Sequence, residues 1–248
     1  MNDRTQTLRS QRTPYVLATV VRAERPTSAK TGDRALVLPD GTMEGFVGGE
    51  CAESAVRDQA LRLLRSGEST LLRITPGADP SPLDGLVTVT NPCLSGGTLD
   101  VFLETVLPPA LVAVYGDGPV ARALVDVGRA AGFDARPAGT AGPPPPDAAA
   151  VVVATHGRDE EALLMAALDA GVPYIGLIAS RKRGAEVTAS LEGGDRVRTP
   201  AGLDIGARTA PEIALSVLAE IMARRPVPER PPARPETAPA EGRGHCCG

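Results

Sequence analysis

The sequence predicts an α/β fold, with an N-terminal mixed α/β domain and a C-terminal Rossmann-like domain built on a parallel sheet. Three observations predict it. Strand-like runs with one helical stretch among them fill the first half of the chain. In the second half, buried-type strands alternate with helical stretches, which is typical of βαβ units. A glycine-containing turn at residues 116–121 joins the first of these strands to a helix.

The first half is predicted to contain six strands and one helix. Residues 14–24 are rich in β-branched and apolar side chains, and residues 34–48 form two strand-like runs joined at Pro39-Asp40-Gly41. From Ala52 the apolar positions fall on one helical face, and Gly67 is a natural stop for that helix. The remaining strands are predicted at residues 69–75, 85–90 and 97–104.

The second half begins after Leu107-Pro108-Pro109, because consecutive prolines discourage a strand or helix from continuing. Proline and glycine at 137–146 exclude a helix, so one crossover is expected to be short and irregular. Strands are predicted at 110–116, 148–156 and 172–180, with helices at 119–133, 158–170, 181–191 and 210–225. The expected organisation is a flexible N-terminus at 1–13, an N-terminal domain at 14–108, a Rossmann-like domain at 109–225 and a disordered Pro-rich tail at 226–248.

Composition excludes several classes of partner. The formal net charge is −4 and aromatic residues make up only 2% of the chain, so we expect no nucleic-acid binding. The start of the chain lacks the apolar stretch of a signal peptide, and the longest apolar run, at 148–153, is too short to span a membrane. We therefore expect a cytoplasmic protein. Four cysteines in that compartment favour metal binding or thiol chemistry over a disulfide framework.

The turn that opens the second half has the pattern G-x-G-x-x-A, formed by Gly116, Gly118 and Ala121. Gly116 permits the tight turn, Gly118 lets a pyrophosphate approach the backbone, and the small Ala121 permits close helix–strand packing. Pro119 suits the first helical turn, whose free amides form an anion site. The pattern predicts a phosphate site, although it also fits a βα turn that binds nothing. An NAD site further needs an acid at the tip of the second strand. In this chain that strand falls in FDARPAGT, residues 133–140, and the only acid there, Asp134, lies at the strand's beginning.

Polar side chains follow the later strands at their carboxyl ends, where ligands of open α/β sheets bind. His156 ends one strand, and Ser180 and Arg181 follow the next and open a helix. Ser180 suits a helix N-cap, and the adjacent cations suit a phosphate. His156 equally fits a polar strand end that bonds a neighbouring loop. A solvated helix face is the usual explanation for the cations, and Arg181 is singled out because it lies at the helix start.

A lone cysteine, Cys51, lies between a glycine loop and the predicted helix of the first half. Gly48 and Gly49 let the loop adopt unusual backbone angles or approach a ligand. The positive end of the helix favours the thiolate form of Cys51. Cys93 lies in a second glycine-containing turn, so the two thiols fit one site, although most such cysteines are small buried packing residues.

A series of motifs runs through both halves: VGGECAES at 47–54, CLSGGTLDVFLETVLP at 93–108 and GDGPVARAL at 116–124, followed by ATHGRDEEAL, YIGLIASRKRG and PAGLDIGARTAPEIALSVLAEIMA. In these motifs and their order the chain resembles the XdhC/CoxI family of molybdoenzyme accessory proteins, from about residue 14 to residue 225. The form VGGECAE is similar to the CoxI-type branch, which is linked to carbon monoxide dehydrogenase.

The resemblance implies a cofactor-binding chaperone rather than an enzyme. It would bind molybdenum cofactor, as molybdopterin or its cytosine dinucleotide form, and assist its maturation, sulfuration and insertion into a xanthine dehydrogenase-type or CO dehydrogenase-type molybdenum hydroxylase. A pyrophosphate at Gly118 and a soft thiolate near molybdenum would then serve one ligand, with Cys51 facing the cleft between the domains. The residues implied in the first domain are Cys51, Glu53 and Cys93, and those in the second are Gly116, Gly118, Ala121, His156, Ser180 and Arg181.

Two other functions remain open at the level of sequence. The Rossmann-like turn also fits an NAD(P)-binding oxidoreductase, and Cys51 also fits a sulfur-transfer enzyme that carries a persulfide taken from a sulfur donor. The predicted partners are the client hydroxylase and a second copy of the chain in a homodimer. The terminal His245, Cys246 and Cys247 are soft ligands that suit a mobile metal hook, although an inert tail with no metal is the favoured interpretation.

Overall fold

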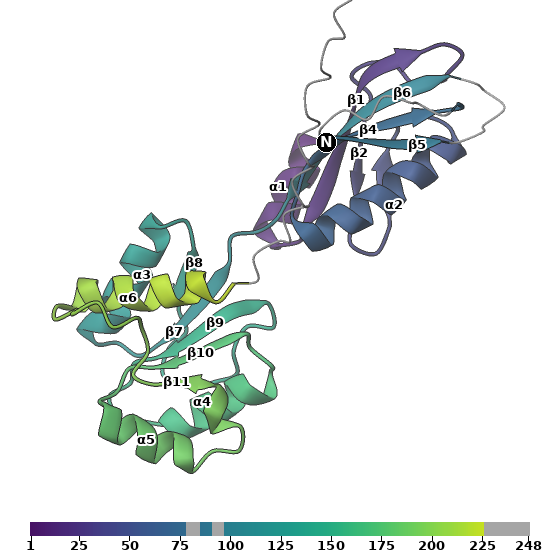
Figure 1. Ribbon diagram of the computed structural model, residues 1–248. Helices are drawn as coiled ribbons and strands as arrows, with labels where there is room; N and C mark the ends of the chain where they lie inside the picture. The colour runs from purple at the N-terminus through teal and green to yellow at the C-terminus, as the bar shows by residue number, and fades with distance from the viewer. Residues whose placement is uncertain (78–84, 91–96, 226–248) are drawn as a thin grey trace, which may run out of the picture.

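The protein forms two lobes joined by a short segment around Pro108 (Figure 1). The computed structural model describes residues 1–77, 85–90 and 97–225. No helix within those residues is long and apolar enough to cross a membrane. The N-terminal lobe contains α1 (Asn2–Ser10), β1 (Tyr15–Glu24), β2 (Arg34–Val37), β3 (Met43–Gly45), α2 (Glu50–Ser66), β4 (Thr70–Thr75), β5 (Leu86–Thr90) and β6 (Thr98–Val106).

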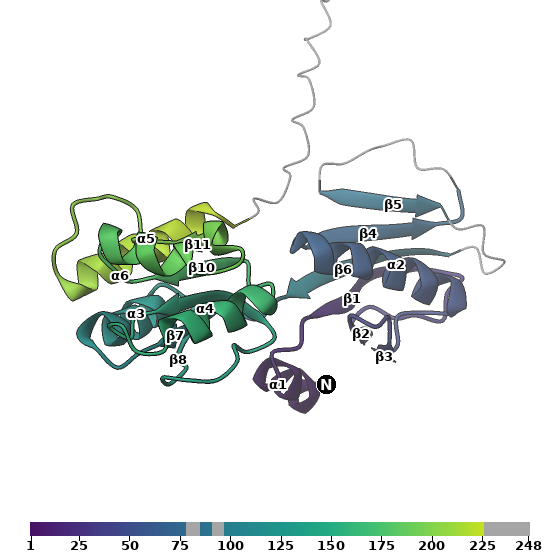
Figure 2. The same ribbon diagram turned by 90° about the horizontal axis from the view of Figure 1, so that it is seen from below.

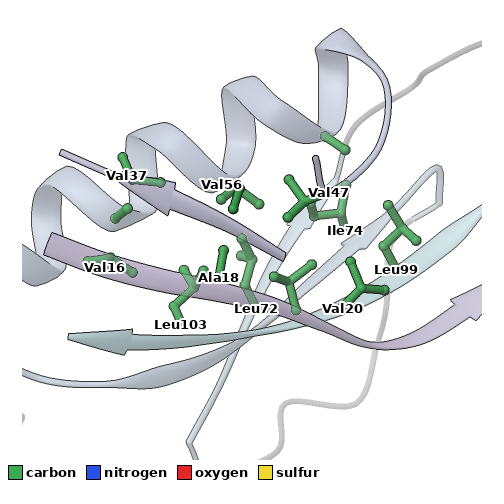
Figure 3. Close-up of a cluster of buried hydrophobic side chains, with 14 of the residues drawn as sticks. Val16, Ala18, Val20, Val37, Val47, Val56, Leu72, Ile74, Leu99 and Leu103 are labelled. Carbon is green, nitrogen blue, oxygen red and sulfur yellow. The ribbon is translucent and has the colours of Figure 1, made fainter. Parts of the chain in front are cut away.

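The sheet of the N-terminal lobe is mixed, with the strand order β3-β2-β1-β6-β4-β5. Among the strands that the structure describes in this lobe, β4 and β5 pair in parallel, while the other neighbours are antiparallel. The helix α2 covers one face, and the alternating side chains of β1 point toward it (Figure 3). On α2 the buried positions are Ala52, Val56, Ala60 and Leu63, the helical spacing that the sequence predicts.

The helix α2 runs from the outer end of its lobe back toward the linker. A Cβ atom added at Gly48, just before the helix, would lie 3.3 Å from Leu99 Cδ1 at the start of β6. A Cβ atom at Gly67, which ends the helix with φ 75°, would lie 3.2 Å from Leu107 Cδ1 just beyond the end of β6. The first turn of α2 therefore lies far from the second lobe, as Figure 2 shows.

The N-terminal segment 1–13 differs from the flexible chain that we expected, because it contains the helix α1. Leu8 is buried against Tyr15 and Leu36, on the face of the sheet opposite to α2. Arg4 binds the carboxylate of Glu44 with its Nη2 atom at 2.7 Å. The helix has low mean hydropathy, so its one apolar anchor gave no periodic signal in the sequence.

The C-terminal lobe is a Rossmann-type domain with a wholly parallel sheet in the order β11-β10-β9-β7-β8. One core packs α3 and α6 on one face, and a second core packs α4 on the other, where Figure 1 also places α5. The elements are β7 (Leu111–Tyr115), α3 (Pro119–Ala130), β8 (Asp134–Pro137), β9 (Ala148–Val153), α4 (Glu160–Asp169), β10 (Tyr174–Leu177), α5 (Arg181–Ala189), a 3-10 turn (Gly194–Arg196), β11 (Val197–Arg198) and α6 (Ala210–Ala223).

The amino end of the parallel sheet faces the N-terminal lobe, and Arg12 connects the two. Its guanidinium binds the carboxylates of Asp134 and Asp147 and donates to the Pro109 carbonyl at 2.8 Å. Asp134 is the first residue of β8 and pairs with Leu111, the first residue of β7. The carboxyl ends of the strands, with the Gly116–Gly118 turn, therefore lie on the side away from the N-terminal lobe (Figures 1 and 2).

Candidate functional site

The turn after β7 needs glycine at both Gly116 and Gly118, because a side chain at either position would clash with a neighbour. Gly116 has φ 122°, and a Cβ atom there would lie 2.3 Å from the Ala154 carbonyl oxygen. Gly118 is the N-cap of α3 in extended backbone, and a Cβ atom there would lie 2.7 Å from His156 Nε2. Pro119 begins the helix and Ala121 is 2% exposed against the sheet. Asp117 and Pro119 are exposed, so the start of α3 is accessible from solvent, and its free amides suit an anion.

His156 is held over the start of α3 by an unusual backbone. Its φ is 56°, in the left-handed region that a non-glycine residue seldom adopts. Its exposed ring faces Gly118 across the edge of the sheet. The preceding Thr155 is 1% exposed, and its hydroxyl has no hydrogen-bond partner among the residues the structure describes. Strained backbone and a buried unpaired hydroxyl beside a glycine turn are features of binding sites rather than of plain connections.

The loop after β9 is tied to the next βα connection by a buried ion pair. Glu160, 4% exposed, accepts from the Gly157 amide at 2.8 Å and from Arg183 Nη1 at 2.8 Å. Arg183 also donates to the Ile178 carbonyl. Ser180 caps α5 by accepting from the Arg183 amide. Of the three cations at the start of α5, Arg181, Lys182 and Arg183, the last is therefore structural. The sequence pattern did not reveal this role.

Arg181 lies at the same edge but is not fixed there. Its guanidinium meets only the Asp204 carboxylate, at 3.7 Å, among the described ion pairs, and its side chain is 86% exposed. An exposed pair at that distance contributes little stability. Arg181 can therefore leave Asp204 and bind an anionic ligand at little cost in stability.

One cavity borders the glycine turn, and a second lies further along the carboxyl edge of the sheet. The smaller, about 180 Å³, lies between β7, β8 and α3 and includes Gly116, Ala121 and Pro137 in its wall. The larger, about 370 Å³, lies beyond the ends of β10 and β11 under the loop 200–207 and reaches Arg181 at its rim. The larger one falls in the size range of small-molecule sites. An anion at the start of α3 would lie next to the smaller cavity, while the larger one lies at the ends of β10 and β11.

Glu220 holds the loop that roofs the larger cavity. Its Oε2 atom accepts from the Gly202 amide at 2.8 Å and from the Tyr174 hydroxyl at 2.8 Å, and Arg224 Nε donates to Oε1 at 3.1 Å. Burial raises the pKa of Glu220, but these hydrogen bonds outweigh it and the net pKa lies below its usual value. Burial, with the Glu220 carboxylate as partner, raises the pKa of Tyr174. In the sequence the loop 200–207 appears only as part of a motif. Its anchor, Glu220, lies in the following helix, α6, and only the fold brings the two together.

Cys51 lies inside the first turn of α2 rather than ahead of it, because the helix begins at Glu50. It is half-buried, with Gly49 as N-cap and Glu53 in the same first turn. Gly48 has φ 133°, and a Cβ atom there would lie 3.1 Å from Ala52 Cβ, so this glycine is required where it stands. The position at the positive end of a helix is the one expected to favour thiolate.

The other candidate ligands fall outside the described residues. Cys93 lies in 91–96, and His245, Cys246 and Cys247 lie in the tail 226–248. The residues that flank Cys93 are placed at the outer end of the N-terminal lobe, since Thr90 pairs with Thr75 and Leu99 pairs with Ile74. That is also where α2 begins. Among residues 1–77, 85–90 and 97–225 no group of three His, Cys, Asp or Glu could hold a metal ion.

The structure does not bring Cys51 into a cleft between the lobes, which corrects that expectation. Cys51 lies at the outer end of α2, and the Gly116–Gly118 turn lies at the outer edge of the parallel sheet. The reason is topological. The chain leaves the N-terminal lobe at the end of β6 and enters the second lobe at the start of β7, so both candidate sites point away from the linker.

A mixed α/β lobe with a cysteine at a helix start, followed by a parallel-sheet lobe with a glycine turn, defines a two-domain Rossmann protein. Comparison with known families agrees. The XdhC Rossmann domain matches residues 112–221, and the XdhC and CoxI family matches residues 8–75. The chain belongs to the XdhC and CoxI family.

The chain is similar to two proteins of Escherichia coli (strain K12). It is 28% identical to YqeB over 249 residues, covering 87% of this chain but only 44% of YqeB. It is 25% identical to the molybdenum cofactor insertion chaperone PaoD over 264 residues, covering 85% of this chain and 83% of PaoD. A solved structure described as a xanthine dehydrogenase from Bacillus halodurans covers 92% of this chain and 97% of its own, with 18% identity and a TM-score of 0.43.

Proposed function

We propose that this protein is an accessory protein that binds molybdenum cofactor and assists its maturation and insertion into a molybdenum hydroxylase. The observation that carries the proposal is the glycine turn at the start of α3, with one cavity against it and a second cavity further along the same edge of the sheet. Membership in the family and similarity to PaoD, named a molybdenum cofactor insertion chaperone, support the same role. The cofactor is cargo in this proposal, not a resident group.

The C-terminal lobe would bind the phosphates of the cofactor. The amides at the start of α3 attract an anion through hydrogen bonding and the helix dipole. His156 lies over the same helix start, and Arg181 at the rim of the larger cavity could pair with a second charge. Thr155 would supply a buried hydroxyl to a ligand that reaches the turn. These groups suit a pterin phosphate or a pterin dinucleotide better than a fully apolar ligand.

The N-terminal lobe would supply the thiol chemistry. Thiolates are soft ligands, suited to molybdenum or to sulfur exchange at its terminal ligand. Cys51 lies at the positive end of α2, which favours the thiolate. We further propose that the client is of the CO dehydrogenase type and that Cys93 joins Cys51 as a second thiol. A persulfide on Cys51 is the alternative role for the same sulfur.

An NAD(P)-linked oxidoreductase is the second candidate, and one contact disfavours it. A ribose-binding acid belongs at the carboxyl tip of the second strand. Asp134 instead begins β8, where it binds Arg12 and Arg136 on the side facing the N-terminal lobe. Its pKa is lowered by the hydrogen bond from Arg136, with further lowering by Arg12, as expected for a structural ion pair.

Gly118→Val tests the proposed function. The added side chain would meet His156 and occupy the space in front of the α3 amides. We expect molybdopterin bound to the purified protein to fall at least about tenfold, a loss of about 1.4 kcal/mol in binding free energy. The measurement is molybdenum content together with pterin fluorescence after oxidation. The client enzyme should accumulate without activity.

The matched control is Gly77→Val, because Gly77 has no neighbour within 4 Å of an added Cβ atom and no positive φ. It should bind cofactor as the natural protein does. Retention of molybdopterin by Gly118→Val, with an unchanged circular dichroism spectrum, would place the cofactor elsewhere. Binding of reduced NAD, measured by the fluorescence of its nicotinamide ring, in a protein that holds no molybdopterin would favour the oxidoreductase.

A further inference from the structure

The smaller cavity lies along α3 beside the glycine turn and is bounded on its other side by the end of β8. Gly116 lines it at the turn, and the buried side chains of Val114, Ala121 and Val125 form its apolar wall. Pro137, the last residue of β8, pairs with Val114 and stands at the strand tip. A volume of about 180 Å³ is smaller than that of a site for a whole small molecule. This cavity therefore fits one ring of a larger ligand.

The α3 side of the cavity carries two polar side chains, Arg122 and Asp126. They are one helical turn apart, so both project from the same face of α3. Asp126 lies about two turns into the helix, about 11 Å from its start along the axis. Because helical side chains lean toward the start of their helix, the Asp126 carboxylate lies nearer to the glycine turn than its Cα atom does.

Among the described residues the Asp126 carboxylate has no hydrogen-bond or ion-pair partner, although it lines a cavity. The acid in the wall of the larger cavity, Asp204, is paired with Arg181. Arg122 donates to the Asp117 carbonyl at 2.5 Å, so its guanidinium is tied to the turn rather than to Asp126. Asp126 is therefore available to accept hydrogen bonds from a ligand.

We propose that the smaller cavity binds the ribose of a ribonucleotide and that Asp126 accepts hydrogen bonds from its 2′- and 3′-hydroxyl groups. This inference rests on the proposed function, in which the phosphates of the ligand lie at the start of α3. A ribose is one ring joined directly to a phosphate, so a ribose in this cavity stays within reach of that helix start. A charged acceptor forms stronger hydrogen bonds to hydroxyl groups than a neutral acceptor does.

Asp126 takes over, from the helix, a role that dinucleotide-binding enzymes give to the second strand. In those enzymes an acid at the strand tip bonds the ribose hydroxyl. Here Pro137 occupies the tip of β8, and Asp134 is held at the other end of that strand by Arg12 and Arg136. The carboxylate therefore approaches the ribose from α3, a geometry that differs from that of an NAD(P) site.

The ribose site selects between the two forms of the cofactor. Molybdopterin carries a phosphate but no ribose, whereas its dinucleotide form carries a ribose next to a pyrophosphate. An anion-binding turn beside a ribose acceptor suits the dinucleotide form. Arg122 lines the same wall one turn nearer to the helix start, and its positive charge offsets the repulsion between the Asp126 carboxylate and the phosphates.

Titration with cytidine 5′-diphosphate, 2′-deoxycytidine 5′-diphosphate and inorganic pyrophosphate tests the inference. The natural protein should bind the ribonucleotide about tenfold more tightly than the deoxyribonucleotide. Asp126→Ala should lower the affinity for the ribonucleotide about tenfold and bind both nucleotides alike, with the affinity for pyrophosphate unchanged. Asp169→Ala, which removes the exposed carboxylate at the end of α4, is the matched control and should bind all three as the natural protein does.

Equal affinity of the natural protein for the two nucleotides would overturn the ribose site, and so would a preference for ribose that survives in Asp126→Ala. In both cases retained binding of pyrophosphate would leave the proposed function intact. If the natural protein bound neither pyrophosphate nor a nucleotide, the anion site at the start of α3 would be wrong, and the proposed function and the inference would fail together.

The cofactor that the protein acquires in cells provides a second measurement. Mild acid hydrolysis of the purified, loaded protein should release a nucleoside monophosphate in about the same amount as the oxidised pterin, with both measured by chromatography. Asp126→Ala should retain less of both. Pterin without a nucleoside monophosphate in the natural protein would overturn the inference while the proposed function stands.

Discussion

At the scale of single residues, the second lobe depends on carboxylates that are buried and fully hydrogen-bonded. Glu160 ties two βα loops together through Gly157 and Arg183. Glu220 fixes the cavity loop through Gly202 and Tyr174. A buried carboxylate stays ionised only when hydrogen bonds replace its hydration, and removal of its partners is costly. These two residues therefore determine the shape of the candidate site without touching a ligand.

Glu220→Gln should lower the free energy of unfolding by about 2 kcal/mol at neutral pH, because hydrogen bonds to a charged acceptor are lost. The pKa of Glu220 is depressed in the folded protein. Its contribution is therefore fully present above the unfolded value of about 4.3 and is lost as the pH falls through the lower folded pKa. Urea unfolding at pH 7 and at pH 3 measures this, and the difference between the two proteins should shrink at pH 3. An equal difference in unfolding free energy at both pH values would contradict an ionised Glu220 in the folded protein.

At the scale of elements, each cavity is made by a loop between a strand and a helix. The loop 200–209 is anchored at both ends. Ala201 donates to the Leu177 carbonyl at 3.1 Å, and the Thr209–Glu212 capping box starts α6. Between these anchors Leu203 and Ile205 remain exposed. The loop is therefore a preformed wall with an apolar rim, which suits a flat ring more than a flexible chain.

Ala207→Trp should fill the larger cavity, because Ala207 lines it. We expect cofactor affinity to fall about tenfold, while binding of inorganic pyrophosphate at the α3 start stays unchanged. Isothermal titration with the two ligands separates the effects. Ala185→Trp, an identical change at an exposed position of α5, serves as the control. Unchanged cofactor affinity in Ala207→Trp would leave this cavity without a role in the site.

At the scale of the whole molecule, the linker and Arg12 set the distance between the two lobes. The contacts of Arg12 bridge residues 122 and 135 positions apart in the sequence. The lobes are otherwise built around separate cores. Their relative orientation therefore depends on few contacts.

Arg12→Ala should loosen the two lobes without unfolding either. We expect a wider distribution of radii in small-angle scattering, because the ion pairs that hold the two lobes together would be lost. Arg9→Ala, which alters an exposed arginine of α1, is the control. A scattering profile identical to that of the natural protein would show that the linker alone fixes the orientation.

The sequence by itself determined the elements whose patterns are local. The helical face of α2, its stop at Gly67 and the turn from Gly116 to Ala121 were all predicted, because side-chain period and backbone freedom act over a few residues. The same holds for the division into a mixed α/β domain and a Rossmann-like domain with a parallel sheet. The family followed from motifs spread through both halves.

Tertiary structure alone decided what lies beside what. The anchoring of α1 by Leu8, the structural role of Arg183, the tie between Glu220 and Gly202 and the ion pairs of Asp134 all join residues far apart in the chain. The placement of Cys51 and Gly118 at opposite ends also follows from the path of the chain, since β6 and β7 meet at the linker. Local patterns carry no information about such distances, because the energy of a long-range contact depends on the fold that brings its partners together.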